Sequence, residues 1–207
     1  MKIPAQKFVS FRMFRSSAAG FTLVELMIVS AITVIILGAI VSIYILGQQA
    51  FVSGTAHIEI HADARLAMDW ISRDARWATR IMTTFNGLNT ETNRLIIEIP
   101  SIDANGDVID ASTTFDYITY QPSPLDATRL VRVIDADPAS GRADGTREIA
   151  DNLGAFVLSS NGVNLSNVAD VTALTEFNIT FQMTRAVLGG RINVNDTLTS
   201  LVQLRNR

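Results

Sequence analysis

Cysteine is absent from this 207-residue chain, and histidine occurs only twice. Without thiols the chain can form neither a disulfide framework nor a zinc site with thiolate ligands, and the redox compartment cannot be read from the sequence. The sequence also contains no phosphate-binding glycine loop and no serine elbow, and no histidine lies in its second half. The residues for common nucleophilic and acid–base chemistry are therefore missing, so we predict no enzymatic activity and no cofactor.

Proline and glycine are scarce in the first half of the chain. No proline occurs between Pro4 and Pro100, and Gly54 is the only glycine in 48–86. Because these two residue types are the strongest helix breakers, their scarcity predicts one long helix from about Phe21 to about Thr83.

Acidic residues are missing from the first 20 positions, which hold four basic residues: Lys2, Lys7, Arg12 and Arg15. All 20 acidic residues follow, so the rest of the chain carries a formal charge of −7. An acidic body disfavours a polyanion such as nucleic acid as a partner, although a local basic patch stays compatible with this charge.

The segment Leu26–Leu46 is almost wholly aliphatic and carries no charge. As a helix it is long enough to cross the roughly 30 Å hydrocarbon core of a bilayer. Four basic residues precede it, and after Glu25 the next charge is Glu59. The positive-inside tendency therefore predicts a single-pass protein with a cytoplasmic amino terminus and a carboxy-terminal domain outside the inner membrane.

Small residues precede the apolar run, in Arg15–Gly20, whereas a secretory signal has its small-residue cleavage site after the run. A cut between Gly20 and Phe21 would leave the apolar segment on the mature chain. It would also create an α-amino group one helical turn from Glu25, whose carboxylate costs on the order of 3 kcal/mol if it stays unpaired near the bilayer centre. The two charges could pair within one chain or between subunits, and in the second case Glu25 would be an assembly residue.

The sequence GFTLVELMIV, residues 20–29, resembles the processing site of type IV prepilins and pseudopilins. The resemblance implies that a membrane prepilin peptidase cuts between Gly20 and Phe21 and that Phe21 becomes N-methylated. It further implies that Glu25 directs assembly into a filament.

Beyond the apolar run, small and aliphatic residues recur at steps of three and four, which predicts an amphipathic helix half. They are Ile60, Ala64, Ala67, Ile71, Ala75, Ala78 and Met82, with Leu66, Trp70, Trp77 and Ile81 beside them. Asp74 falls within this apolar arc, where we expect a buried partner or a capping role, with packing favoured over a functional role. The stretch ARLAMDWISRDARWATRI also resembles minor pilins and the J-type minor pseudopilin of type II secretion around SRD.

The second half of the chain consists of short β-rich runs separated by turn residues. The predicted strands are Arg94–Ile99, Phe115–Gln121, Arg129–Ile134, Ala155–Ser159, Phe177–Arg185 and Leu198–Arg205, with Arg147–Ala150 weaker. An antiparallel sheet laid over the apolar arc of the helix gives an α+β fold, in which one long amino-terminal helix packs on the sheet. Pilin subunits are similar, and the ending LTSLVQLRNR resembles that of many minor pilins.

Two patterns raise the question of a metal site. His57 and His61 share a helix face at zinc-ligand spacing, but no third ligand is identifiable, and a solvated or subunit-facing segment is the favoured interpretation. Asp103, Asn105 and Asp107 alternate as in calcium loops, yet the position of the completing glutamate holds a threonine, and an Asn-Gly turn explains the pattern as well. The loop DADPASGRADG has a similar but weaker calcium-like pattern. We predict no metal.

The missing disulfide loop and the missing helix-kinking proline depart from abundant major pilins. The sequence therefore favours a minor pilin, with prepilin peptidase, other pilins and the inner membrane as partners. The alternatives are a minor pseudopilin of type II secretion and a permanently anchored periplasmic binding or sensor module. The expected divisions are a leader (1–20), a transmembrane half-helix (21–48), an amphipathic half-helix (49–84) and a periplasmic β-rich domain (85–207).

Overall fold

The computed structural model describes residues 20–110 and 113–204 and contains one long helix, α1 (Leu23–Trp77), of 55 residues. The described residues form two compact units, of which the first ends at Gly47 and the second begins at Gln48. Helix α1 contributes residues to both units and is long and apolar enough to cross a membrane, with a mean hydropathy of 2.8 in its most apolar window.

The carboxy-terminal end of α1 differs from the sequence prediction, because the helix stops at Trp77 rather than near Thr83. The backbone N–H of Thr79 donates to the carbonyl of Glu98 over 2.8 Å, and that of Met82 donates to Ile96 over 2.9 Å. Residues after Trp77 thus exchange helical hydrogen bonds for bonds to a neighbouring strand. Pairing with a strand some 17 residues away outweighs the helical pattern, which continues through this stretch.

The first sheet has five antiparallel strands in the order β1-β4-β5-β6-β7. Its strands are β1 (Arg80–Ile81), β4 (Leu95–Pro100), β5 (Phe115–Pro122), β6 (Leu130–Asp135) and β7 (Gly145–Ala150). From β4 to β7 each strand pairs with the next one along the chain, so this part of the sheet is a meander with β7 at one edge.

A second sheet has four antiparallel strands in the order β11-β10-β8-β9. Its strands are β8 (Leu153–Ser160), β9 (Val163–Asn164), β10 (Glu176–Val187) and β11 (Ile192–Gln203). The remaining elements are the β2 (Thr84–Phe85) and β3 (Leu88–Asn89) hairpin and two short 3-10 helices, η1 (Leu165–Asn167) and η2 (Val171–Ala173). The expected α+β arrangement of a long helix with antiparallel strands is confirmed, but the strands divide between two main sheets.

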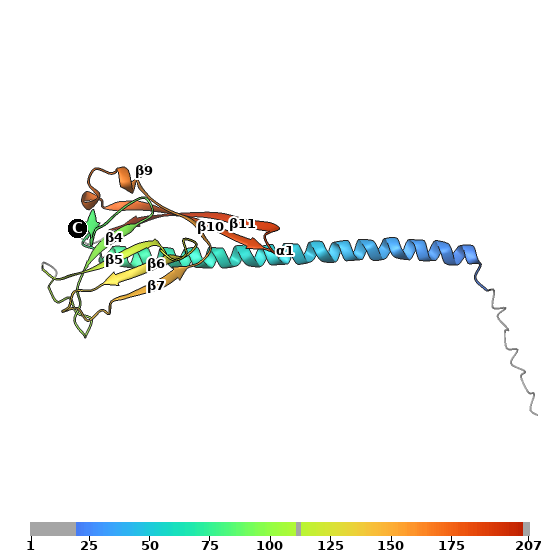
Figure 1. Cartoon of the computed structure of the whole chain (residues 1–207), viewed down its shortest axis with the longest axis horizontal. Helices are drawn as coiled ribbons and strands as arrows, with labels where there is room; N and C mark the ends of the chain where they lie inside the picture. Colours follow the sequence, from blue (N-terminus) through green and yellow to red (C-terminus); the bar gives the residue numbers. More distant parts are fainter. Residues whose placement is uncertain (1–19, 111–112, 205–207) are drawn as a thin grey trace, which may run out of the picture. The chain divides into compact units, whose positions relative to one another are not determined.

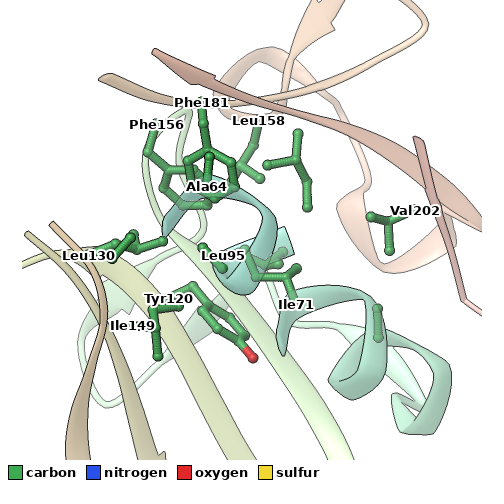
Figure 2. Close-up of a cluster of buried hydrophobic side chains, with 14 of the residues drawn as sticks. Ala64, Ile71, Leu95, Tyr120, Leu130, Ile149, Phe156, Leu158, Phe181 and Val202 are labelled. Atoms are coloured by element: carbon green, nitrogen blue, oxygen red, sulfur yellow. The ribbon is translucent and has the colours of Figure 1, made fainter. Parts of the chain in front are cut away.

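The core of the second unit forms where α1 lies between these two sheets (Figure 1). Ala64 and Ile71 of the helix meet Leu95 and Tyr120 of the first sheet and Phe181 of the second, as Figure 2 shows. Seven small and aliphatic residues were predicted to recur along the apolar face of the helix, from Ile60 to Met82. Five of them are buried within α1, Ala78 is buried just after the end of the helix, and Met82 is half-buried. The helix is therefore covered on two sides, which one sheet could not achieve.

The predicted strands correspond to observed ones, apart from their ends. The last strand was predicted from Leu198 but begins six residues earlier, at Ile192, and forms a twelve-pair hairpin with β10. The turn between them, Leu188–Arg191, has positive φ angles at three successive residues. The predicted end of that strand, Arg205, lies outside the described residues.

Candidate functional site

The predicted cleavage site lies immediately before helix α1. Gly20 and Phe21 are not helical, and both are exposed, Phe21 by 77%. No heavy atom beyond its chain neighbours comes within 4 Å of a Cβ built at Gly20. The peptide bond between the two residues is therefore open to an enzyme. The four basic leader residues lie outside the described part of the chain.

A reciprocal pair of hydrogen bonds closes the first turn of α1 between Thr22 and Glu25. The Thr22 hydroxyl accepts from the backbone N–H of Glu25 over 3.2 Å, and Glu25 Oε2 accepts from the backbone N–H of Thr22 over 3.1 Å. The Thr22 hydroxyl also donates to Oε2, over 3.1 Å. This is a capping box, in which two backbone N–H groups without helical partners are satisfied.

The capping box gives Glu25 a local role that our sequence reasoning missed. An acid in the first turn also interacts favourably with the positive end of the helix macrodipole. The signal was present in the sequence, because Thr-x-x-Glu directly before an apolar run is typical of a helix start. The hydrogen bonds use Oε2, so Oε1 stays able to accept from another donor.

The apolar run that follows, Leu26–Leu46, is exposed along its whole length. Its large side chains are between 50% and 71% exposed, although a soluble protein rarely leaves an apolar surface of this extent in water. Lipid or other apolar helices must therefore cover this segment. The run thus fits a membrane-anchored subunit.

Residues 15–41 match the family model described as the prokaryotic N-terminal methylation motif. The chain carries that motif. The match spans Gly20, Phe21, Glu25 and most of the apolar run, and it supports a type IV pilin-like family. Comparisons with characterised proteins and with solved structures gave no match.

A methylation motif of this type implies processing by prepilin peptidase and assembly with other pilins. It points to a structural subunit of the pilin or pseudopilin kind rather than to an enzyme. Together with the long apolar helix, the motif fits a membrane-anchored pilin-like protein.

Two residues of the segment 57–61 contact the β10–β11 hairpin. His61 Nε2 contacts the Asp196 carboxylate, and the Glu59 carboxylate contacts Arg185, while His57 is exposed. Within residues 20–110 and 113–204, no group of three or more His, Cys, Asp or Glu residues could hold a metal ion. These contacts instead tie α1 to the second sheet.

The loop in which Asp103, Asn105 and Asp107 alternate as in calcium loops is a tight turn, closed by hydrogen bonds to the side chain of Asp103. Asp103 accepts hydrogen bonds from the backbone N–H groups of Asn105, over 2.8 Å, and of Asp107, over 3.0 Å. These bonds, that from Asp107 foremost, lower the pKa of Asp103. Gly106 supplies a left-handed residue with φ of 91°. The geometry agrees with the turn interpretation of the sequence.

The buried carboxylate of Asp116 binds the second acidic loop and Ser101, which lies just before the first acidic loop. It accepts from the hydroxyls of Ser101, over 2.8 Å, and Ser140, over 2.9 Å, and it also accepts from Arg142. Arg142 donates as well to the carbonyl of Pro100 over 2.6 Å. Among the residues that the structure describes, the guanidinium of Arg142, from the second loop, therefore pairs with a β5 carboxylate and not with the acidic side chains of the loops.

Asp74 has a buried partner, which is one of the two roles that its place in the apolar arc predicted. Arg132 Nε donates to Asp74 Oδ2 over 2.6 Å, and the Tyr120 hydroxyl also donates to this oxygen. Burial first, and then the Asp74 charge, raises the pKa of Tyr120. Burial, the largest single effect, would lower the pKa of Arg132, but the hydrogen bond to Asp74, the charge of Asp74 and the interactions with Tyr120 together outweigh burial and raise this pKa. This network holds charge inside the core and joins α1 to the first sheet.

Proposed function

We propose that the chain is a minor pilin-like structural subunit that is incorporated into, primes or tips a type IV pilus. The observation that carries the proposal is the methylation motif at the start of an exposed apolar helix. The absence of cysteine, and of proline between Pro4 and Pro100, supports a minor rather than an abundant shaft subunit. Its proposed partners are prepilin peptidase, other pilins and the inner membrane.

In this proposal, prepilin peptidase removes residues 1–20, and the new amino terminus on Phe21 is N-methylated. Gly20 and Phe21 are both exposed and not helical, which supports access by the enzyme. Every atom of the capping box belongs to Thr22 or Glu25, after the cut. The first helical turn therefore stays capped when the leader is removed.

Glu25 then has two tasks, one for each carboxylate oxygen. Oε2 caps the helix through Thr22, and Oε1 neutralises the α-amino group of Phe21 in the same subunit or in a neighbour. The negative charge on Glu25 thereby steers the subunit into a growing filament. The apolar run moves from lipid to a bundle of like helices, where it stays covered.

We place the amino terminus in the cytoplasm and the carboxy-terminal domain in the periplasm, because the basic residues precede the apolar run. The proposed divisions are the leader (1–20), the membrane and assembly segment (21–48), the amphipathic segment (49–84) and the β-rich domain (85–207). Since α1 ends at Trp77, the amphipathic segment also includes β1.

Mass spectrometry of the amino terminus of the protein from its own cells tests the processing step. The expected species begins with N-methylated Phe21. An intact Met1 would instead contradict a filament subunit and support a permanently anchored periplasmic binding or sensor module.

Two substitutions separate the charge of Glu25 from its capping bonds. Glu25→Gln keeps an oxygen for the capping box but removes the charge, whereas Thr22→Ala keeps the charge and removes a cap worth about 1 kcal/mol. We expect Glu25→Gln to be cleaved normally yet to be strongly depleted from sheared filaments, while Thr22→Ala is incorporated. Equal depletion of both variants would assign the role of Glu25 to helix capping alone.

A minor pseudopilin of type II secretion remains the alternative, since the motif supports both classes. Deletion of the gene distinguishes them. Loss of surface pili and of twitching is expected for the pilus subunit, whereas loss of protein export with intact pili would favour the pseudopilin.

A further inference from the structure

Three arginines from three elements converge on the indole of Trp70 in the second unit. The guanidinium carbons of Arg147, Arg73 and Arg132 lie 4.9, 5.1 and 5.3 Å from its ring centroid. Arg73 comes from α1, Arg132 from β6 and Arg147 from β7. Since all three surround one ring, no two are further apart than about 10 Å, which is close to the screening length in 0.1 M salt.

The positive charge of this cluster is only partly neutralised within the protein. Asp74 pairs with Arg132, but among the described residues neither Arg73 nor Arg147 forms an ion pair. Asp69 lies four residues before Arg73, a spacing that favours an ion pair on a helix, yet Arg73 lies over Trp70 instead. Glu148, next to Arg147, is bound to Arg129 over 2.8 Å. Among the described residues, the carboxylate of Asp74 is therefore the only one that forms an ion pair with this group of three arginines.

The pairing of β6 with β7 adds to the electrostatic repulsion between these arginines. Arg132 and Arg147 are direct partners across the β6–β7 ladder. Like charges in directly opposite positions destabilise a sheet. The cation–π contact of each guanidinium with Trp70 offsets part of the repulsion, and an external anion would remove more of it.

Guanidinium N–H donors of these arginines are also available to an external anion. Arg132 uses Nε for its bonds to Asp74 and Tyr120, and its two terminal nitrogens have no hydrogen-bond partner among the described residues. Arg132 is buried, with 9% of its surface exposed, whereas Arg73 and Arg147 are exposed. The site thus presents guanidinium groups gathered around one indole ring, which suits an oxyanion.

Arg73, Arg132 and Arg147 together with Trp70 form what we call the Trp70 cluster. We infer that the Trp70 cluster binds carboxylate side chains of an extended acidic segment of a partner protein. The position of Arg147 favours a peptide, because β7 is an edge strand of the first sheet and residues Gly145–Glu148 are exposed. An extended segment can pair with such an edge, and alternate side chains of the segment then lie on the same face as Arg147. This inference does not depend on incorporation into a pilus.

The test uses the full-length chain in neutral detergent, with Trp77→Phe so that Trp70 is the only fluorophore of its kind. The probe is a hexapeptide of alternating threonine and glutamate, and its matched control has glutamine in place of glutamate. Arg73→Gln with Arg147→Gln removes the unpaired charges. Arg65→Gln with Arg191→Gln removes the same charge at two other exposed arginines.

We expect the glutamate peptide to change Trp70 fluorescence saturably, more weakly at higher salt. The dissociation constant should rise by at least about tenfold in the Arg73/Arg147 variant and by less than about twofold in the Arg65/Arg191 variant. Absence of saturation, equal binding of the glutamine peptide, or equal weakening in both variants would overturn the inference. Binding of inorganic phosphate without binding of the peptide would also overturn it, by showing a small-anion site.

Discussion

At the scale of single residues, the buried charge of Asp74 shows how the core tolerates an ion. Asp74 and the side chain of Arg132 are each only about 10% exposed, so both ions have lost most of their hydration. Their attraction and the hydroxyl of Tyr120 compensate for that loss. Removing one member leaves the other charge without a partner in a poorly hydrated site.

We therefore predict that Asp74→Ala lowers the free energy of unfolding by about 3 kcal/mol. Tyr120→Phe, which removes one hydrogen bond, should cost about 1 kcal/mol. Guanidinium unfolding of the full-length protein in detergent, followed by tryptophan fluorescence, measures both values. The double variant Asp74→Leu and Arg132→Met should lose less than Asp74→Ala, since it removes both ions. A larger loss in the double variant would contradict this account.

Asp116 gives a pH dependence of defined sign. Burial would raise its pKa, but hydrogen bonds from Arg142, Ser101 and Ser140 and from the backbone outweigh burial and lower it. A pKa that is lower in the folded state stabilises the protein fully above the unfolded value, about 3.9, and this contribution disappears as the pH falls through the folded value. We expect Asp116→Asn to be less stable than the wild type at pH 6 and the difference to shrink at pH 3 in guanidinium unfolding. A difference that is constant with pH would show that the carboxylate charge does not contribute.

The sequence predicts some residue-scale features and not others. Asp74 could be assigned a buried partner because its position in the apolar arc follows from helical periodicity alone. The identity of that partner could not be predicted, since Arg132 lies 58 residues further on, in another element. The capping box at Thr22 and Glu25 is a local pattern, so the sequence alone could have predicted it. We instead interpreted the charge of Glu25 in the apolar run as a partner for the new amino terminus at the cleavage site.

At the scale of elements, periodicity and turn residues predict the helix and the long strands, because these signals are local. Element ends depend on partners that are distant in the chain. Helix α1 stops at Trp77 because the following residues bond to β4, and β11 begins early because β10 offers twelve pairing positions. The division into two sheets could not be predicted either, since local patterns do not specify which strands become neighbours.

A glycine between two loops tests the packing of those elements. A Cβ at Gly141 would lie 2.5 Å from the carbonyl oxygen of Asp103, so backbone atoms would have to move. We predict that Gly141→Ala lowers the free energy of unfolding by about 1–3 kcal/mol, as overpacking does. Gly145→Ala, only four residues away, meets nothing within 4 Å and should change stability by less than about 0.5 kcal/mol. Equal melting temperatures for the two variants in detergent would argue against the close contact.

At the scale of the whole molecule, the two compact units differ in how their apolar residues are covered. Among residues 20–110 and 113–204, the buried apolar residues begin at Ala56 and belong to the second unit, whereas the apolar run of the first unit is exposed throughout. We predict that a shortened chain of residues 48–207 stays soluble without detergent and keeps its β-rich circular dichroism spectrum. The full chain should require detergent or lipid. Aggregation of the shortened chain under the same conditions would show that its fold depends on the apolar segment.

The enclosure of α1 by two sheets also determines how the second unit responds to force. Between Ala56 and Ala75 the helix carries buried side chains that contact strands on both sides. Tension along the helix axis would load these contacts in shear, so that many must slide together before any one is released. A peeling load would break them one after another. If the chain is incorporated into a fibre, as proposed, a pull on its helix would therefore pass to the β-rich part through many contacts at once.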